Sequence, residues 1–159
     1  MTNPILTSLL YIERDGNYLM LHRVKRDGDI NAGKWIGVGG KFERDESPEE
    51  CVIREAREET GLTLLRPVFR GIVTFVSDRF PTEYMHLFTC TAFEGTLRDC
   101  DEGDLAWVEK SRVPSLPLWE GDRIFLRLLA EDAPFFSLKL VYEGDALVRA
   151  ILDGRELSL

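Results

Sequence analysis

The sequence predicts a mixed β-sheet packed by helices, in an α+β or α/β sandwich. Three observations support this: apolar, β-prone runs outnumber the helical patterns, one helix is expected in mid-chain, and a second is expected late in the chain. The 159 residues, 44% hydrophobic and 30% charged, suit one globular domain. We expect that domain to span residues 1–159, with a core over about residues 3–132 and a C-terminal hairpin over residues 135–152 packed on it.

The N-terminal region begins with an expected β-hairpin. The runs Thr7–Glu13 and Tyr18–Val24 are apolar and β-prone, and the Asp-Gly pair at residues 15–16 is a strong signal for the turn between them. A polar loop is expected over residues 26–34, followed by a short strand over residues 35–38.

The mid-chain helix has the clearest start signal in the chain. Ser47 can cap the helix, Pro48 suits the first helical position, and Glu50 completes a capping box. Gly61 is the expected end of this helix. The later elements are expected to be strands over residues 63–77 and 82–93 around a turn at Pro81, a strand over 105–108, a helix over 120–130, and a hairpin of strands 135–142 and 146–152.

The mid-chain helix gathers carboxylates on one side. With 3.6 residues per turn, Glu58 lies about 60° to one side of Glu55 and Glu59 about 40° to the other. The adjacent face, which we expect to be the core face, carries Val52, Ile53, Ala56 and Thr60. Like charges at this spacing destabilise a helix unless a hard divalent cation binds their oxygens. A solvated acidic helix is the alternative interpretation.

The spacing of the wider segment is more specific than the helix alone. It runs Gly40, five residues, Glu46, seven residues, Arg54-Glu55-Ala56, one residue, Glu58-Glu59, one residue, Gly61-Leu62. This segment, which is called the box below, resembles position for position the signature of the Nudix hydrolases. A chance match is on the order of 10⁻⁹ per window. The resemblance implies an α/β/α sandwich with a mixed sheet, in which the segment forms a loop–helix–loop.

The resemblance also implies an activity and a metal site. Nudix enzymes hydrolyse a nucleoside diphosphate linked to another group, with water and usually Mg²⁺ or Mn²⁺. Carried over, Glu55 and Glu59 are the expected main metal ligands, and Glu58 is expected on the metal or as the base. The carbonyl group of Gly39 is a further expected ligand. Arg54 is expected to pair with Glu46 or a box glutamate and to orient it.

The run Gly33-Lys34-Trp35-x-Gly37-x-Gly39-Gly40-Lys41 resembles the MutT-like branch, and in particular the oxidised-purine nucleoside triphosphatases. In that branch Lys41 is expected near phosphate; the alternative is a surface lysine. Glu102, which precedes the strand expected over residues 105–108, is implied as a metal ligand or base; the alternative is a charged loop. Ile36 departs from the branch, which has a base-contacting asparagine there, and an isoleucine cannot hydrogen-bond a base.

The run Leu118-Trp119-Glu120-Gly121-Asp122 resembles the base-binding run of the same branch. Trp119 is then expected to pack on the base and Asp122 to read its edge, although Gly121 stands where the branch has a first aspartate. A core role for Trp119 and a capping role for Asp122 are the alternatives.

The leading hypothesis is therefore a metal-dependent pyrophosphohydrolase that converts a nucleoside triphosphate, with 8-oxo-dGTP as a candidate, to nucleoside monophosphate and pyrophosphate. One alternative is another Nudix substrate class such as ADP-ribose, whose members often carry a proline beyond the box where this chain has Ser77-Asp78. A second is a non-catalytic Nudix domain that senses nucleotide, although such domains usually lose box glutamates and none is lost here.

Charge and composition limit the partners. The 20 Lys and Arg against 28 Asp and Glu give a net charge of −8, which disfavours binding to nucleic acid or to a membrane surface. The chain shows neither a membrane-length apolar run nor the basic start of a signal peptide. Its three cysteines show no CxxC spacing. We expect a reduced, cytoplasmic protein with a small-molecule nucleotide substrate, and the sequence sets no oligomeric state.

Overall fold

The computed structural model describes residues 2–159, so Met1, the first residue of the expected domain, lies outside the described part. In chain order the elements are β1 (Ile5–Arg14), β2 (Asn17–His22), β3 (Trp35–Ile36), α1 (Pro48–Thr60), β4 (Leu62–Leu64), β5 (Val68–Ser77), β6 (Glu83–Cys90), β7 (Phe93–Gly95), β8 (Asp104–Glu109), a 3₁₀ helix (Val113–Ser115), α2 (Asp122–Ala130), β9 (Phe136–Glu143), β10 (Ala146–Leu152) and β11 (Arg155–Glu156). No helix within residues 2–159 is long and apolar enough to cross a membrane.

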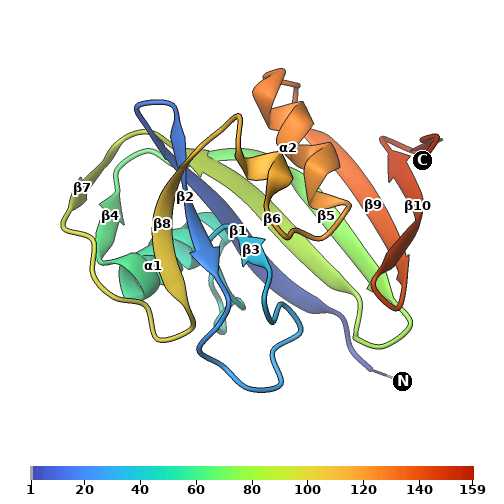
Figure 1. Cartoon of the computed structure of the whole chain (residues 1–159), viewed down its shortest axis with the longest axis horizontal. Coiled ribbons are helices and arrows are strands. Elements are labelled where there is room, and N and C mark those ends of the chain that lie inside the picture. Colours follow the sequence, from blue (N-terminus) through green and yellow to red (C-terminus); the bar gives the residue numbers. More distant parts are fainter. Residues whose placement is uncertain (1) are drawn as a thin grey trace.

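The predicted mixed sheet is confirmed (Figure 1). Its strands lie in the order β11-β10-β9-β5-β6-β1-β2-β3, and β8 pairs with β2 outside this path. β1 runs parallel to β6 and β5 parallel to β9, whereas the other neighbours are antiparallel. β4 and β7 form a separate antiparallel pair.

The two helices pack on opposite faces of this sheet. Side chains alternate between the faces along β1, as they do in any strand. Leu9 shares a core cluster with Phe125 of α2, whereas its neighbour Leu10 shares another with Val52 of α1. The architecture is therefore the predicted α/β/α sandwich, with β1 in the middle of both cores (Figure 1).

Helix α1 has the predicted ends. The hydroxyl group of Ser47 accepts a hydrogen bond from the Glu50 backbone N–H at 3.1 Å, and the Glu50 carboxylate accepts one from the Ser47 N–H at 2.9 Å. Gly61 closes the helix in the left-handed conformation, with φ of 81°. The expected core face was wrong at Ile53, which is 37% exposed, while Glu59 is only 8% exposed. The loop after β3 packs against α1 and covers Glu59 instead, through a hydrogen bond from Gly39.

One predicted strand is divided in the structure, and another is shorter than expected. The run expected over residues 63–77 breaks into β4 and β5 around Pro67, which lacks the N–H group needed for sheet pairing. The strand expected over residues 35–38 ends at Ile36, and Val38 instead exchanges backbone hydrogen bonds with Leu10 of β1. The second helix starts at Asp122 rather than at residue 120, and β11 was not predicted.

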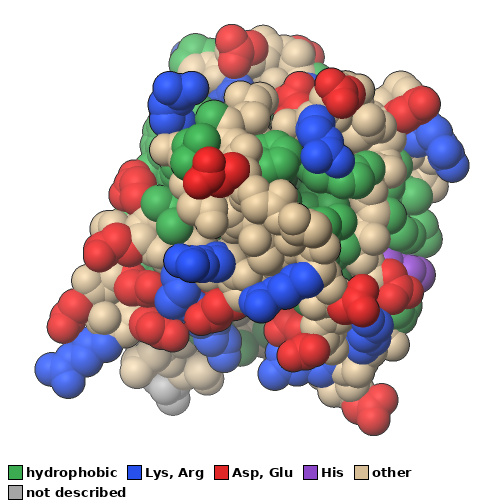
Figure 2. All heavy atoms as spheres, turned by 90° about the vertical axis from the view of Figure 1, so that its left-hand side faces the viewer, with side chains coloured by type: hydrophobic (Ala, Val, Ile, Leu, Met, Phe, Trp, Pro, Cys, Tyr) green, Lys and Arg blue, Asp and Glu red, His purple; other side chains and the backbone are tan. Residues whose placement is uncertain are grey.

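On the face shown in Figure 2, the side of the molecule that carries β4, β7 and α1, acidic and basic side chains are interspersed. Among the ion pairs of the described residues, Arg54 pairs with Glu58 of α1 at 3.1 Å.

Candidate functional site

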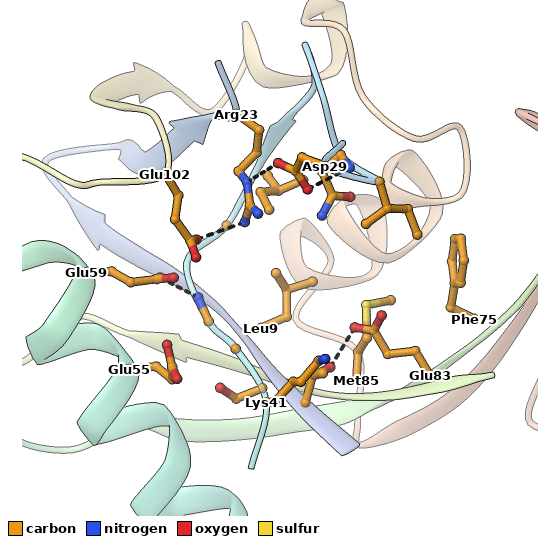
Figure 3. Close-up of a pocket in the computed structure, with 18 of the residues that line it drawn as sticks. Leu9, Arg23, Asp29, Lys41, Glu55, Glu59, Phe75, Glu83, Met85 and Glu102 are labelled. Carbon is orange, nitrogen blue, oxygen red and sulfur yellow. Dashed lines mark hydrogen bonds and ion pairs between the residues drawn. The ribbon is translucent and has the colours of Figure 1, made fainter. Parts of the chain in front are cut away.

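The structure contains a cleft of about 800 Å³. It is lined by β1, by the loops that follow β2 and β3, by α1, by β5 and β6, and by residues near positions 102 and 119–122. Figure 3 shows Glu55, Glu59 and Glu102 at one end of the cleft, and Phe75, Met85 and a further carboxyl group, Glu83, at the other end. We call them the glutamate end, formed by Glu55, Glu59 and Glu102, and the aromatic end, formed by Phe75, Met85, Trp119 and Asp122.

At the glutamate end, α1 lies very close to the loop that follows β3. The Glu59 carboxylate accepts a hydrogen bond of 2.9 Å from the backbone N–H of Gly39. A Cβ atom on Gly40 would lie 2.6 Å from the Glu55 carboxyl group, and one on Gly39 would lie 2.0 Å from the Ser8 carbonyl oxygen. At Gly39 only glycine fits, because a Cβ atom would collide with the backbone of β1, whereas a side chain at Gly40 would displace the Glu55 carboxyl group.

Arg54 holds the loop and the helix together. Its guanidinium group donates two hydrogen bonds to Glu46, at 2.7 and 2.9 Å, and one to Glu55 at 2.8 Å. It also donates to Glu58 at 3.1 Å and to the carbonyl oxygen of Lys41 at 3.1 Å. Arg54 thus pairs with Glu46 and with two glutamates of α1 through a planar donor, and its orienting role stays a prediction.

Glu102 reaches the same end of the cleft from the turn before β8. Its carboxylate pairs with Arg23 at 3.0 Å and with Arg26 at 3.1 Å, and Asp29 holds Arg23 from the other side at 2.6 Å. Sequence reasoning missed both arginines, because the loop that carries them contains no recognised motif. Glu102 and the cations of this loop thus face Glu55 and Glu59 across the cleft (Figure 3).

The glutamate end concentrates negative charge in a partly desolvated place. Burial raises the pKa of Glu59 to about 9, and the negative charges of Glu102 and Glu55 act in the same direction. Burial also raises the pKa of Glu55, against the opposing effect of Arg54. The hydrogen bonds from Arg54 lower the pKa of Glu46. The carboxyl groups of this cluster therefore interact too strongly to ionise independently.

The donor set at this end fits a hard divalent cation. Glu55, Glu59 and Glu102 offer carboxylate oxygens, the ligands that Mg²⁺ and Mn²⁺ prefer, and all three line the cleft. Within residues 2–159 no three acidic, His or Cys side chains are already arranged to hold a metal ion. Glu55 and Glu102 instead form ion pairs with arginines. Binding a cation would thus exchange these ion pairs for metal–oxygen bonds.

Three other predicted site residues are placed differently from these carboxylates. Glu58 is not among the residues that line the cleft; its side chain is 58% exposed and is held by Arg54. Lys41 does line the cleft and lies between its two ends (Figure 3). Ile36 also lines it, at the end of β3, so the position where the MutT-like branch has an amide is apolar here.

At the aromatic end, Trp119 is nearly buried and still faces the cleft. Its indole N–H donates to the Asn31 side-chain oxygen at 2.8 Å, and Phe75 packs edge-on against its ring. The ammonium group of Lys34 lies 4.3 Å from the centre of the ring. The residue belongs both to the core and to the cleft, so the two interpretations of Trp119 are compatible. Asn31 was missed because it lies in the polar loop.

Asp122 is the first residue of α2 and is only 6% exposed. It does not cap the helix with its side chain, since the capping position is Gly121. Burial raises its pKa to about 8; Arg123 and Lys34 oppose this shift, and Glu83 adds to it. A buried carboxyl group beside an aromatic ring can therefore be present in its neutral form near pH 7.

Glu83 is a second carboxyl group in this region and was not predicted. It begins β6, lines the cleft, and accepts a hydrogen bond of 2.8 Å from the Thr7 hydroxyl group. Its position in a β-prone run did not indicate that Glu83 would face the cleft, because the strand register decides which side chains do so.

Comparisons with known proteins agree with this geometry. A family model described as the NUDIX domain matches residues 4–129. The chain is 30% identical over 159 residues to the oxidized purine nucleoside triphosphate hydrolase of Danio rerio, covering 98% of this chain and 97% of that protein. It is 32% identical over 112 residues to the CTP pyrophosphohydrolase of Escherichia coli, covering 70% and 80%. A crystal structure of a MutT protein from Bacillus halodurans superposes with a TM-score of 0.84 at 28% identity, over 94% of this chain and 97% of that chain.

Proposed function

The chain belongs to the NUDIX hydrolases, in their MutT-like branch, and from this premise we propose that it is a metal-dependent pyrophosphohydrolase of nucleoside triphosphates. The observation that carries the proposal is the polarity of the cleft. Acidic oxygen ligands gather at one end, as Figure 3 shows for Glu55, Glu59 and Glu102, and the Trp119 indole lies at the other end with the buried carboxyl group of Asp122. A nucleoside triphosphate has the matching polarity, with phosphates at one end and an uncharged aromatic base at the other.

Divalent metal ions are generally used by Nudix hydrolases, and here Mg²⁺ or Mn²⁺ is proposed at Glu55 and Glu59, with the carbonyl oxygen of Gly39 as a further ligand. When bound, the cation supplies Lewis-acid stabilisation of the phosphate oxygens. It also removes the repulsion between an acidic protein and an anionic substrate. Lys41 and Arg23, which line the cleft, are proposed to meet the remaining phosphate charge.

The proposed reaction is hydrolysis of the phosphoanhydride bond between the α and β phosphates. A water oxygen bonds to the phosphorus, the bond from that phosphorus to a bridging oxygen breaks, and the products are a nucleoside monophosphate and pyrophosphate. A carboxylate takes the proton of the attacking water. We assign this role to Glu102 rather than to Glu58, because Glu102 lines the cleft and Glu58 does not. Arg54 is proposed to position Glu55.

For the substrate we propose 8-oxo-dGTP, on the strength of the relative named for oxidized purine nucleotides and of the aromatic end. Trp119 offers a face or edge to a purine, and Asp122 offers a buried carboxyl group to its hydrogen-bonding edge. Ile36 contributes packing alone, so selectivity for the oxidised base falls on few polar groups.

A panel of nucleotides tests the proposal. Purified protein with Mg²⁺ is incubated with 8-oxo-dGTP, dGTP, CTP and ADP-ribose, and pyrophosphate and phosphate are measured separately. We expect pyrophosphate and monophosphate from the triphosphates, abolished by a chelator and restored by Mg²⁺ or Mn²⁺. Rapid cleavage of ADP-ribose without triphosphate turnover would contradict the proposal, and binding without turnover of any nucleotide would indicate a sensor.

A further inference from the structure

Glu83 is a carboxyl group of the cleft that the proposed reaction does not use. It is half-buried at the first position of β6 and lines the cleft. The Thr7 hydroxyl group donates to one of its oxygens at 2.8 Å, and within residues 2–159 Glu83 forms no ion pair and no second side-chain hydrogen bond. One carboxyl oxygen is thus fixed by the chain, and the other keeps its capacity for a ligand.

The strand register places Glu83 at the aromatic end. It pairs directly with Phe75 across β5 and β6. Two residues further along β6, Met85 points to the same face, beside Thr7 of β1. Figure 3 shows Phe75, Glu83 and Met85 together, away from Glu55 and Glu59. A nucleotide with its phosphates at the glutamate end therefore brings its base, and not its phosphates, toward Glu83.

The electrostatic surroundings identify the kind of group that Glu83 can meet. Burial raises its pKa, while the Thr7 hydrogen bond and the positive charge of Lys41 oppose this. Glu83 also acts on Asp122, whose pKa its charge raises further. The ionised carboxylate of Glu83, which the Thr7 hydrogen bond and Lys41 favour, accepts hydrogen bonds and donates none, so it suits a donor better than a carbonyl oxygen. On a nucleobase the exocyclic amino group is such a donor.

We propose that Glu83 is a specificity-determining residue that accepts a hydrogen bond from the exocyclic amino group of the base. The inference rests on the proposed function, and it adds that amino-bearing bases are preferred to otherwise identical bases without the amino group. A site built to bond a polar group rejects an analogue that lacks it, because its own buried polar atom is then left unpaired.

Two pairs of nucleotides test the amino group, and the first pair isolates it. The bases of dGTP and dITP differ only in the 2-amino group, whereas dCTP differs from dUTP in having an amino group in place of a carbonyl and an acceptor N3 in place of N3–H. We measure kcat/KM with Mg²⁺ for all four, in the wild type and in Glu83→Gln. The matched control is Glu94→Gln, on exposed strand β7 and outside the cleft. The wild type should prefer the amino-bearing partner by at least ~10-fold in the pair that it turns over faster.

In Glu83→Gln that preference should fall to within ~3-fold of unity, because the amide can donate to a carbonyl as well as accept from an amine. Glu94→Gln should keep the wild-type ratio. Absence of a preference in the wild type would overturn the proposal, as would an unchanged ratio in Glu83→Gln. An equal loss on both partners, with a lower kcat, would also overturn it and would place Glu83 with Lys41 at the phosphates.

A second variant covers the case in which Glu83→Gln does not fold, as judged by thermal denaturation. Thr7→Val removes the hydroxyl group that holds Glu83 and should reduce the preference in the same direction, by a smaller factor. An unchanged ratio in a folded Thr7→Val would then overturn the proposal. The proposed function and this inference fail differently: the former fails if the wild type turns over no triphosphate, and the inference alone fails if turnover persists with the preference unaltered.

Discussion

Both ends of the cleft hold partly buried carboxyl groups, but their surroundings differ. At the glutamate end, Glu55 and Glu102 are each paired with an arginine, and Glu59 is bonded to a backbone N–H group. At the aromatic end, Asp122 and Glu83 lie among aromatic and aliphatic side chains, and within residues 2–159 neither forms an ion pair.

The different surroundings suit the carboxyl groups at the two ends to two different tasks, binding of metal and phosphate at one end and binding of the base at the other. Crowded carboxylates that already pair with cations suit a site for metal and phosphate charge. The buried carboxyl groups at the aromatic end, which pair with no cation among the described residues, can instead hydrogen-bond an uncharged base. No hydrogen bond or ion pair within residues 2–159 joins a side chain of one end directly to one of the other, so we expect substitutions at one end to leave the other working. The predictions below test this independence in order of their expected effect on turnover.

The largest effect is expected for Glu59→Gln. The amide keeps the size of the side chain and its bond from Gly39, but it removes the charge that is proposed to hold the cation. We expect kcat to fall at least ~100-fold, with nucleotide preference retained. Glu49→Gln, at an exposed position of the same helix, is the control. Full activity with an unchanged Mg²⁺ requirement in Glu59→Gln would remove this residue from the proposed metal site.

A smaller effect is expected for Arg54→Lys. The lysine keeps the charge but cannot bond Glu46 with two parallel donors while it also holds Glu55. Loss of a group that orients a metal ligand typically costs roughly 10–100-fold in activity, and we expect a fall in kcat of that size. Thermal denaturation of the same samples separates the two roles of Arg54. A lower melting temperature with normal turnover per folded molecule would make it structural alone.

The glutamate end could be predicted from the sequence because its parts are local. Glu55 and Glu59 lie one turn apart on a single helix, and the positions of Arg54 and Glu46 follow from the same short segment. The orientation of the helix could not be predicted to the same degree. The core face was misjudged at Ile53, since the residues that α1 buries depend on the loop after β3 that packs beside it.

The aromatic end depends on contacts between distant segments. Phe75 and Glu83 are brought together by the register of β5 and β6, and that register shifts at a bulge between Phe69 and Gly71. A shift of one residue exchanges the two faces of a strand, so no local pattern identifies which side chains enter the cleft. Trp119 and Asp122 were identified only through their resemblance to a family motif.

Asp122→Asn tests whether the aromatic end sets the choice of base. If a neutral or charged carboxyl group at this position reads the oxidised edge, the wild type should prefer 8-oxo-dGTP to dGTP by ~10–100-fold in kcat/KM. The variant should lose most of this preference and keep its Mg²⁺ requirement. A wild-type preference above ~10⁴ would indicate a more extensive polar readout than Asp122 and Glu83 provide. A changed metal requirement in the variant would show that the two ends are coupled.

The last prediction concerns stability rather than turnover, and it again uses Asp122. Burial raises the pKa of this carboxyl group from 3.8 to about 8 in the folded protein; Arg123 and Lys34 oppose the shift, and Glu83 adds to it. Between those values the folded state keeps a proton that the unfolded state has lost. The stability that comes from the neutral form is therefore complete below the unfolded pKa and is lost as the pH rises through about 8.

Asparagine cannot ionise, so the melting temperature of Asp122→Asn relative to the wild type should rise with pH, by about 3 °C or more between about pH 5 and about pH 9. The raised pKa of Glu59 is present in both proteins and cancels in this difference. The exposed Asp99→Asn serves as the control, and a difference for Asp122→Asn that stays constant across this pH range would show that Asp122 is ionised in the folded protein at neutral pH.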